Sequence, residues 1–436
     1  MQMKNCLSVA AMSGLCALAV CLSACMGGKG GSRGGATHSP SPTPEGNNGV
    51  NQTTTIAEHP VVNVYLENSG SMNGYVNGGQ TLFQQDVYNY LCDIDISGIP
   101  SEINLHFINS QIIDQGSVIA NFIHKLTPNS FHVAGGNTAT TDIASVFKQV
   151  LAQTDDDTVS VFISDCIFSP GSVQSPEAYL VNQQVGIKKC VADYLAMHSE
   201  LAILVYQLYS NFNGTYYDYR NRPRSYVGER PYYIWVMGHP LNIAKLRVAI
   251  PNEKFSGAGV QNEWCIYNKT VDQVAYSIVS RPVNGDFDRN SDHAISKIKK
   301  GNNGQFAFMV TANFTSLELL LGNEYLMNAD NYSRLINKQD SEEWYIEIAR
   351  NTNPSSPATH NIILGTDGPI PQGNLSVAVR CSSPQWAYDF TDDDDSNFTD
   401  ANQRKTYGLK YMFDGIQQAF TARSNGIYAV MDFKIN

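Results

Sequence analysis

The chain has 436 residues, of which 42% are hydrophobic and 16% are charged, and its formal net charge is −11. A domain usually has about 100–200 residues, so the length accommodates two ordinary domains. The 34 glycines and 18 prolines are close to average usage, which excludes collagen-like and wholly disordered chains. The acidic balance argues against nucleic acid as a partner, because binding to phosphates needs clustered Lys and Arg.

The first residues have the pattern of an export signal. Lys4 precedes an apolar stretch over residues 6–24 that is short for a membrane span. The ending Leu22-Ser23-Ala24-Cys25 resembles the lipobox of bacterial lipoproteins. This resemblance implies that residues 1–24 are a signal peptide and that Cys25 carries a lipid. The alternative is an ordinary cleaved signal with a chance cysteine.

Residues 25–57 are rich in Gly, Ser, Thr, Pro and Asn, so they are expected to form a tether without a core. The sequence therefore predicts a globular body in the cell envelope, held to a membrane by its lipid anchor, with the outer membrane as the expected location. Residues 26–29 lack the acidic side chains that are associated with surface export in some bacteria. Their absence favours the periplasmic face.

Five further cysteines follow the lipobox, namely Cys92, Cys166, Cys190, Cys265 and Cys381. An exported protein can form disulfides. An odd number leaves at least one thiol unpaired within the chain, and no CxxC metal spacing occurs. We interpret these cysteines mostly as small buried side chains.

Strand-like and helical segments alternate over residues 58–250. The expected strands are 61–66, 103–108, 159–163, 201–206 and 232–237, and the expected helices are 80–92, 141–151, 176–198 and one from Leu241 onward. This alternation predicts an α/β domain with a Rossmann-like, mainly parallel sheet flanked by helices. In such sheets, ligands bind at the carboxyl ends of the strands.

Residues 251–436 have a different pattern. Strand-like runs at 264–267, 306–314, 344–348, 375–380 and 427–433 are separated by polar loops, with helical patterns at 294–300 and 414–422. This half is expected to be a smaller β-rich C-terminal domain, and its sequence does not indicate a role.

Three polar segments are expected at one edge of the sheet. Glu67-Asn68-Ser69-Gly70-Ser71-Met72 follows the first strand, residues 135–143 lead into a helix, and Ser164-Asp165-Cys166 ends a buried strand. Mg²⁺ prefers oxygen ligands, with water in the remaining octahedral positions. Serine and threonine hydroxyls and two carboxylates supply such ligands.

This arrangement resembles the von Willebrand factor A (vWA) domain and its metal-ion-dependent adhesion site. The first motif of that family is Asp-x-Ser-x-Ser, and residues 67–72 match it except that Glu67 stands in place of Asp. Thr141-Asp142-Ile143 fits the family's threonine loop, although extra residues after Gly136 leave Thr138 and Thr140 as alternatives. Asp165 matches the family's final aspartate. The resemblance covers residues 58–250.

The resemblance implies a metal site formed by Glu67, Ser69, Ser71, Thr141 and Asp165. It implies Mg²⁺, or else Mn²⁺ or Ca²⁺, with a coordination position open to a carboxylate of a partner. A protein or glycan ligand would then be bound through the cation, without catalysis. Because glutamate is one methylene longer than aspartate, Glu67 would ligate the metal directly, displace a water or crowd the site.

Two other readings of the same residues stay open. In the first, Ser69, Gly70 and Ser71 form a hydroxyl-capped turn in a fold without metal, as in a structural or assembly subunit of an envelope complex. In the second, Ser69 or Ser71 is the nucleophile of a metal-dependent hydrolase. No histidine lies near either serine in sequence, so His132 or His198 would have to approach through the fold.

Three smaller patterns complete the sequence. Residues 286–292 resemble the start of a calcium loop but lack its glycine and closing glutamate, so a solvated turn is expected. The run at 392–395 is expected to be an exposed acidic loop. A cluster of Tyr206, Tyr209, Tyr216, Tyr217, Tyr219 and Tyr226 with Arg220, Arg222 and Arg224 indicates either a binding surface or ordinary hairpin packing.

Overall fold

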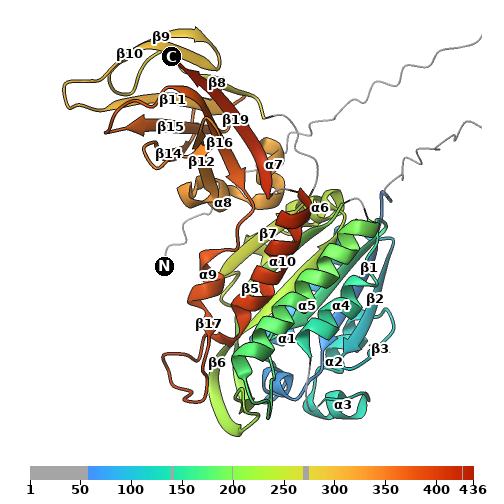
Figure 1. Cartoon of the computed structure of the whole chain (residues 1–436). Coiled ribbons are helices and arrows are strands. Elements are labelled where there is room, and N and C mark those ends of the chain that lie inside the picture. Colours follow the sequence, from blue (N-terminus) through green and yellow to red (C-terminus); the bar gives the residue numbers. More distant parts are fainter. Residues whose placement is uncertain (1–56, 139–141, 199, 269–273, 425) are drawn as a thin grey trace, which may run out of the picture. The chain divides into compact units, whose positions relative to one another are not determined.

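The computed structural model of the chain describes residues 57–138, 142–198, 200–268, 274–424 and 426–436 (Figure 1). The expected signal peptide, Cys25, the tether up to residue 56 and Thr141 lie outside the described residues. None of the helices in the described part of the chain combines the length and apolar character that a membrane span requires.

A seven-stranded sheet forms the centre of the α/β part. Its strand order is β3 (Ile112–Asp114), β2 (Glu102–Ile108), β1 (Val61–Glu67), β4 (Thr158–Ser164), β6 (Pro223–Gly238), β5 (Ala202–Tyr217) and β7 (Asn262–Tyr267). Strand β1 pairs in parallel with both β2 and β4. The remaining pairs, β2/β3, β4/β6, β5/β6 and β5/β7, are antiparallel. The expectation of a mainly parallel sheet is therefore wrong, and the sheet is mixed.

The long hairpin of β5 and β6 explains this difference. Parallel neighbours need a crossover of a dozen or more residues, usually a helix. The chain instead turns back within residues 218–222, and β6 pairs with β5 from Tyr217↔Pro223 to Ala202↔Gly238. Strand β6 thereby enters the sheet between β4 and β5, antiparallel to both. The two expected strands at 201–206 and 232–237 are the ends of this hairpin that lie farthest from its turn.

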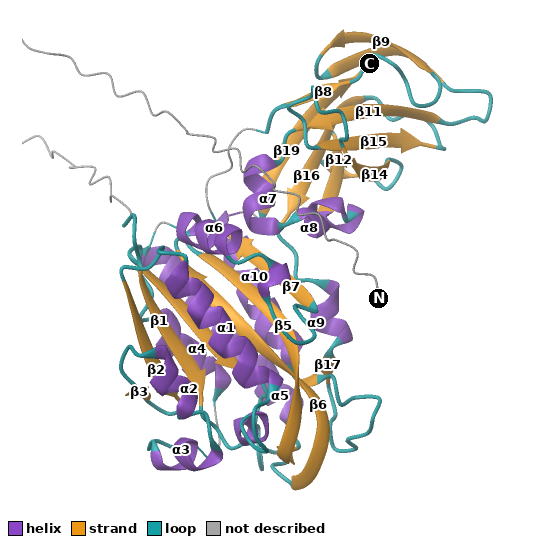
Figure 2. Cartoon of the chain, turned by 180° about the vertical axis from the view of Figure 1, so that it is seen from behind, coloured by secondary structure: helices purple, strands orange, loops and turns teal. Residues whose placement is uncertain are grey.

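Helices cover both faces of the sheet. Figures 1 and 2 show α4 (Ile143–Leu151) and α5 (Pro176–Met197) on one face and α1 (Leu82–Ile96) on the other. Helix α1 begins at a capping box in which the Thr81 hydroxyl accepts from the Gln84 N–H and the Gln84 side chain accepts from the Thr81 N–H. Because both faces are covered, β4 is buried from Val159 to Ser164.

The β-rich region contains two further sheets. One has the order β13 (Gln339–Asp340), β12 (Tyr332–Ile336), β16 (Gly373–Arg380), β19 (Ile427–Ile435), β10 (Ala294–Lys299) and β9 (Asp286–Ser291). The other has the order β14 (Tyr345–Arg350), β15 (His360–Thr366), β11 (Phe306–Ala312) and β8 (Tyr276–Ile278). Their buried aromatic core includes Phe308, whose ring lies 5.8 Å from that of Trp344 and 5.9 Å from that of Phe433. The expected β-rich region is thus present.

The helix expected at 294–300 is wrong, because this segment is strand β10. The apolar residues Ile295 and Ile298 are three apart, which is helical spacing, but the strand contains a register shift against β9 between Ser296 and Lys299. Lys297 has a positive φ of 52° at this irregularity. The extra residue of a bulge interrupts the period of two that would have identified a strand.

Segments of the C-terminal half belong to the α/β part. Strand β7 is the edge of the seven-stranded sheet, and α10 (Leu409–Ser424) lies along α5 (Figure 1). A Cβ at Gly415 would come within 2.7 Å of the Gln184 carbonyl oxygen, so the two helices approach closely there. The domain boundary expected after residue 250 therefore does not coincide with the division between the sheets.

Candidate functional site

Ser69 and Ser71 lie where the chain leaves β1. The strand ends at Glu67, and the short 3₁₀ helix η1 (Ser71–Tyr75) begins four residues later. The two hydroxyl oxygens are 2.9 Å apart. The Gly70 N–H donates to the Thr138 carbonyl oxygen at 2.8 Å, which joins this turn to the loop before α4.

Asp165 follows β4 and is 1% exposed. Its Oδ1 accepts from the Ile167 N–H at 3.2 Å, and its Oδ2 has no hydrogen-bond partner among the described residues. Burial raises the pKa of Asp165, while the nearby Ser71 hydroxyl, the Ile167 N–H and the charge of Arg230 act to lower it. Ser69, Ser71 and Asp165 therefore lie together at the carboxyl ends of two parallel strands.

Glu67 contacts the neighbouring strand. In the register of β1 with β4, Leu66 lies opposite Ile163, so Glu67 comes next to Ser164. The Ser164 hydroxyl donates to Glu67 Oε2 and accepts from the Cys166 N–H at 2.8 Å. The longer side chain thus binds the end of β4 with one carboxylate oxygen, in a position where it is 1% exposed.

The threonine loop is described only in part. Thr141 and Thr140 lie outside the described residues, whereas Thr138 contacts the turn at Gly70 through its carbonyl oxygen. Asp142 is the N-cap of α4, and its side chain accepts from the Ser145 N–H at 3.2 Å. The part of this loop that is described therefore reaches the serine turn.

The oxygen atoms described at this edge of the sheet fit a cation that prefers oxygen ligands. No group of three or more His, Cys, Asp or Glu side chains within the described ranges is arranged to hold a metal. The possible metal ligands at this edge are instead two serine hydroxyls and the carboxylates of Asp165 and Glu67. These are ligands of the kind that Mg²⁺ binds together with water. A buried carboxylate oxygen without a partner costs several kcal/mol, and a cation would offset that cost.

Arg230 is a residue at this site that the sequence patterns did not indicate. It lies on β6, is 1% exposed, and donates from Nη1 to the Gln403 carbonyl oxygen at 2.8 Å. Burial acts to lower the pKa of Arg230, but Tyr216, Tyr75 and Asp165 raise it above its usual value. Its Nη2 has no hydrogen-bond partner among the described residues. In the sequence, the only indication of this residue is that the basic Arg230 stands just before the expected strand at 232–237.

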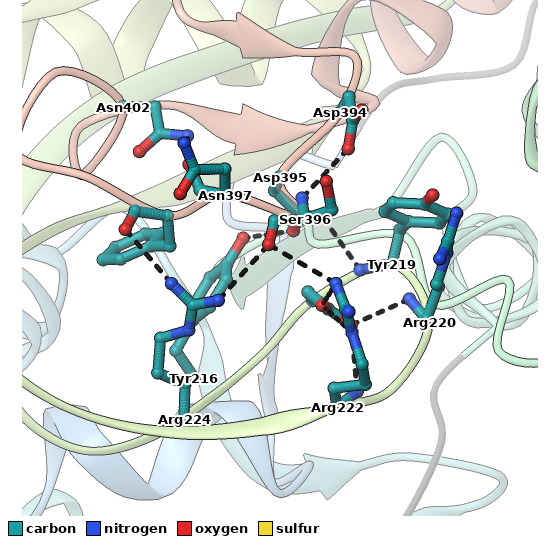
Figure 3. Close-up of polar contacts among 12 residues, drawn as sticks. Tyr216, Tyr219, Arg220, Arg222, Arg224, Asp394, Asp395, Ser396, Asn397 and Asn402 are labelled. Atoms are coloured by element: carbon teal, nitrogen blue, oxygen red, sulfur yellow. Dashed lines mark hydrogen bonds and ion pairs between the residues drawn. The ribbon is translucent and has the colours of Figure 1, made fainter.

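Part of the cluster of tyrosines and arginines contacts the loop between β17 (Thr391–Asp392) and β18 (Thr406–Tyr407) (Figure 3). Within this loop, Asp395 is fully buried and accepts from the Tyr216 hydroxyl and, at 2.8 Å, from the Tyr219 N–H. The expectation of an exposed acidic loop is therefore wrong for Asp395, because the hairpin supplies it with donors. Asp393 and Asp394 are exposed.

The arginines of the hairpin contact the same loop. Arg222 and Arg224 donate to the Ser396 carbonyl oxygen at 3.3 and 3.2 Å, and Arg224 also donates to the Phe398 carbonyl oxygen at 3.2 Å (Figure 3). The Phe398 ring lies 4.4 Å from that of Tyr216. These contacts within the chain favour the packing interpretation of the cluster.

Two further expectations concern residues 286–292 and the five cysteines. Residues 286–291 are strand β9, with Asp288 paired to Lys297 at 2.8 Å, so the solvated turn expected there begins only after the strand. All five described cysteines have free thiols. Cys166, Cys265 and Cys381 are buried, and Cys92 and Cys190 are half-buried, which agrees with their interpretation as small buried side chains.

Comparisons of the chain with protein-family models, with curated proteins and with solved structures gave no match.

Proposed function

We propose that the protein is a cell-envelope lipoprotein whose vWA-like domain binds a protein or glycan ligand through a divalent cation. The cation would lie at the carboxyl ends of β1 and β4, with Ser69, Ser71 and Asp165 as ligands. Glu67 would contribute directly or through a water, and Thr141 is the remaining expected ligand. The supporting observation is the buried Asp165 Oδ2 without a partner beside the pair of serine hydroxyls.

The chemistry of adhesion follows from this ligand set. Mg²⁺ has six coordination positions and dehydrates reluctantly, so a site with few protein ligands keeps waters that a ligand oxygen can replace. A carboxylate from a partner would supply such an oxygen and part of the missing negative charge. The partner's affinity would then require the cation.

A metal-free structural or assembly subunit is the second candidate, and Arg230 favours it. A buried guanidinium that lowers the pKa of Asp165 is itself a countercharge for this carboxylate. If Arg230 alone balances Asp165, the serine turn needs no cation to be stable, and the domain acts through its surface.

Calorimetric titration of the purified protein with Mg²⁺ and Mn²⁺ separates these candidates. The adhesion proposal predicts saturable binding that is lost in the double variant Ser69→Ala/Ser71→Ala. Ser172→Ala, at an exposed position after β4, is the matched control and should bind as the parent does. Absence of saturable binding in the parent protein contradicts the cation site and supports the metal-free subunit.

The anchor has its own test. Metabolic labelling of the expressing bacterium with radioactive palmitate should label the protein, and Cys25→Ala should abolish the label. A protein that stays unlabelled and is released without detergent would contradict the lipoprotein assignment while leaving the cation site untouched. A metal-dependent hydrolase, the less favoured alternative, would turn over model esters or phosphoesters and lose this activity in the same serine variants.

A further inference from the structure

The outer face of the six-stranded sheet contains a hollow of about 800 Å³. Strand β19 alternates there, with Asp432 and Lys434 exposed and Met431 and Phe433 buried in the core. On the same face of β16, Asn374 lies opposite Lys434 and Ser376 lies opposite Asp432. These four side chains form the floor of the hollow, and all of them belong to regular strands. Figure 1 shows β16 and β19 side by side.

Several polar groups of the hollow have hydrogen-bonding capacity left. Three exposed residues line it, namely Lys338, Lys434 and Asn374, and their side chains make no hydrogen bond or ion pair with another described residue. Asp432 Oδ1 accepts from the Ser376 hydroxyl at 2.5 Å, and its second oxygen is available. The hollow thus offers donors and acceptors on neighbouring strands, together with apolar surface.

The turn between β12 and β13 forms one rim of the hollow. Asn337 and Lys338 have positive φ values of 50° and 70°. Asn337 Oδ1 accepts from the Asn374 N–H at 3.0 Å, and its Nδ2 donates to the Gln372 carbonyl oxygen at 3.2 Å. A Cβ at Gly373 would come within 2.2 Å of the Asn337 side chain, so the glycine is needed for this contact. The turn is therefore fixed to β16.

The opposite rim carries an aromatic ring. His293 is exposed and lines the hollow, and its ring stacks on that of Tyr276 at 4.2 Å. Its Nε2 hydrogen-bonds the Tyr276 carbonyl oxygen at 3.0 Å, and the Tyr276 hydroxyl accepts from the Asp432 N–H at 2.9 Å. An oriented ring beside amide, carboxylate and ammonium groups is suited to the alternating C–H and hydroxyl surfaces of a sugar.

The charge of the hollow narrows the ligand class. Lys338 and Lys434 oppose one carboxylate, Asp432, so the hollow is locally cationic in a chain with a net charge of −11. We propose that this hollow binds an acidic saccharide, with Asn374 and Asp432 pairing with ring hydroxyls and the two lysines pairing with the sugar carboxylate. This binding requires no cation and is separate from the site at Ser69 and Asp165.

The proposal is tested by calorimetry of the full protein in EDTA, which removes any contribution of a divalent cation. The probes are tetragalacturonate and its methyl ester, together with 3′-sialyllactose and lactose. We expect at least one acidic probe to bind at least tenfold more tightly than its neutral counterpart, because hydrogen bonds to a charged group are stronger than those between neutral groups. Lys434→Ala should weaken this binding about tenfold or more.

Two further variants complete the design. Asp432→Asn keeps the shape of the side chain but replaces one carboxylate oxygen by an amide donor, so it should weaken binding by leaving fewer acceptors for ring hydroxyls. Lys299→Ala, which removes an exposed lysine of β10 outside the hollow, is the charge-matched control and should bind as the parent does. Thermal melting of each variant checks that it is folded.

Three results would overturn the proposal. They are the absence of binding to both acidic probes, equal binding of the charged and neutral members of each pair, and equal weakening by Lys299→Ala and Lys434→Ala. Tetraglutamate is tested as a non-sugar anion of the same charge. Binding of tetraglutamate as tight as that of tetragalacturonate would replace the saccharide by an acidic peptide.

Discussion

The guanidinium of Arg230 and the carboxyl group of Asp165 are both buried, and the charge of each shifts the pKa of the other. Each group has one polar atom without a hydrogen-bond partner among the described residues. A buried charge whose partner is removed is strongly destabilising, by about 3–5 kcal/mol. The pair therefore links the stability of the fold to the chemistry of the candidate cation site.

The first prediction concerns Arg230. Arg230→Met should lower the free energy of unfolding in EDTA by about 3–5 kcal/mol, because it leaves Asp165 without its internal countercharge. Saturating Mg²⁺ should recover more stability in Arg230→Met than in the parent, since the cation then supplies the missing positive charge. Urea unfolding with and without Mg²⁺ measures both effects. Equal gains from Mg²⁺ in the two proteins would show that the cation does not interact with Asp165.

The second prediction concerns Asp165. Asp165→Asn retains the size of the side chain but removes its charge, so Mg²⁺ should no longer stabilise the protein. At 100 times the dissociation constant, Mg²⁺ should add about 2.7 kcal/mol to the parent protein and nothing measurable to the variant. Asp142→Asn is the comparison, because it retains a side chain that can cap α4 and should respond to Mg²⁺ as the parent does. A full response in Asp165→Asn would contradict the assignment.

The third prediction concerns Asp395, whose pKa is raised from its ordinary value of 3.8 to about 6, chiefly by burial. In the folded state, Asp395 therefore stays protonated up to a higher pH than in the unfolded state. The contribution of this carboxyl group to the free energy of unfolding falls as the pH rises from about 4 to 6. A shift of this size corresponds to about 3 kcal/mol. The difference in unfolding free energy between the parent and Asp395→Asn should change by up to this amount between pH 4 and pH 7.

Urea unfolding at several pH values measures this difference. Asn397→Ala, at an exposed position of the same loop, changes no titratable group and should differ from the parent by a constant amount across the range. A difference between the parent and Asp395→Asn that is independent of pH would mean that the loop does not bury this carboxyl group in solution.

The fourth prediction concerns the contact between α10 and α5. Gly415→Ala should destabilise the protein by about 1–3 kcal/mol, because the new Cβ would lie 2.7 Å from the Gln184 carbonyl oxygen. This cost outweighs the gain of about 1 kcal/mol in helix propensity. Gln418→Ala on the same helix, which lacks such a contact, should change stability by less than about 0.5 kcal/mol. Thermal or urea unfolding that shows stabilisation by Gly415→Ala would contradict the close packing of the helices.

The sequence alone identified the features that depend on local pattern. The runs that became β1 and β4 are apolar and β-branched, and helices α1 and α5 begin after the hydroxyl caps Thr81 and Ser175, so their positions follow from nearby residues. Parallel neighbours end at the same edge of a sheet, which is why Ser69, Ser71 and Asp165 were expected together although nearly 100 residues separate them. Their proximity in the structure agrees with this reasoning, whereas cation binding stays a prediction.

Tertiary structure alone decided the features that depend on distant partners. The bulge that makes residues 294–299 a strand forms against β9, and β6 takes its place beside β4 because the chain turns back where a crossover was expected. Asp395 is buried because Tyr216 and Tyr219, far away in sequence, satisfy its oxygens. The charge of Arg230 acts on Asp165 because β6 pairs with β4. Local pattern determines which segments form strands and helices, but burial and charge pairing are set by side chains that only the completed fold brings into contact.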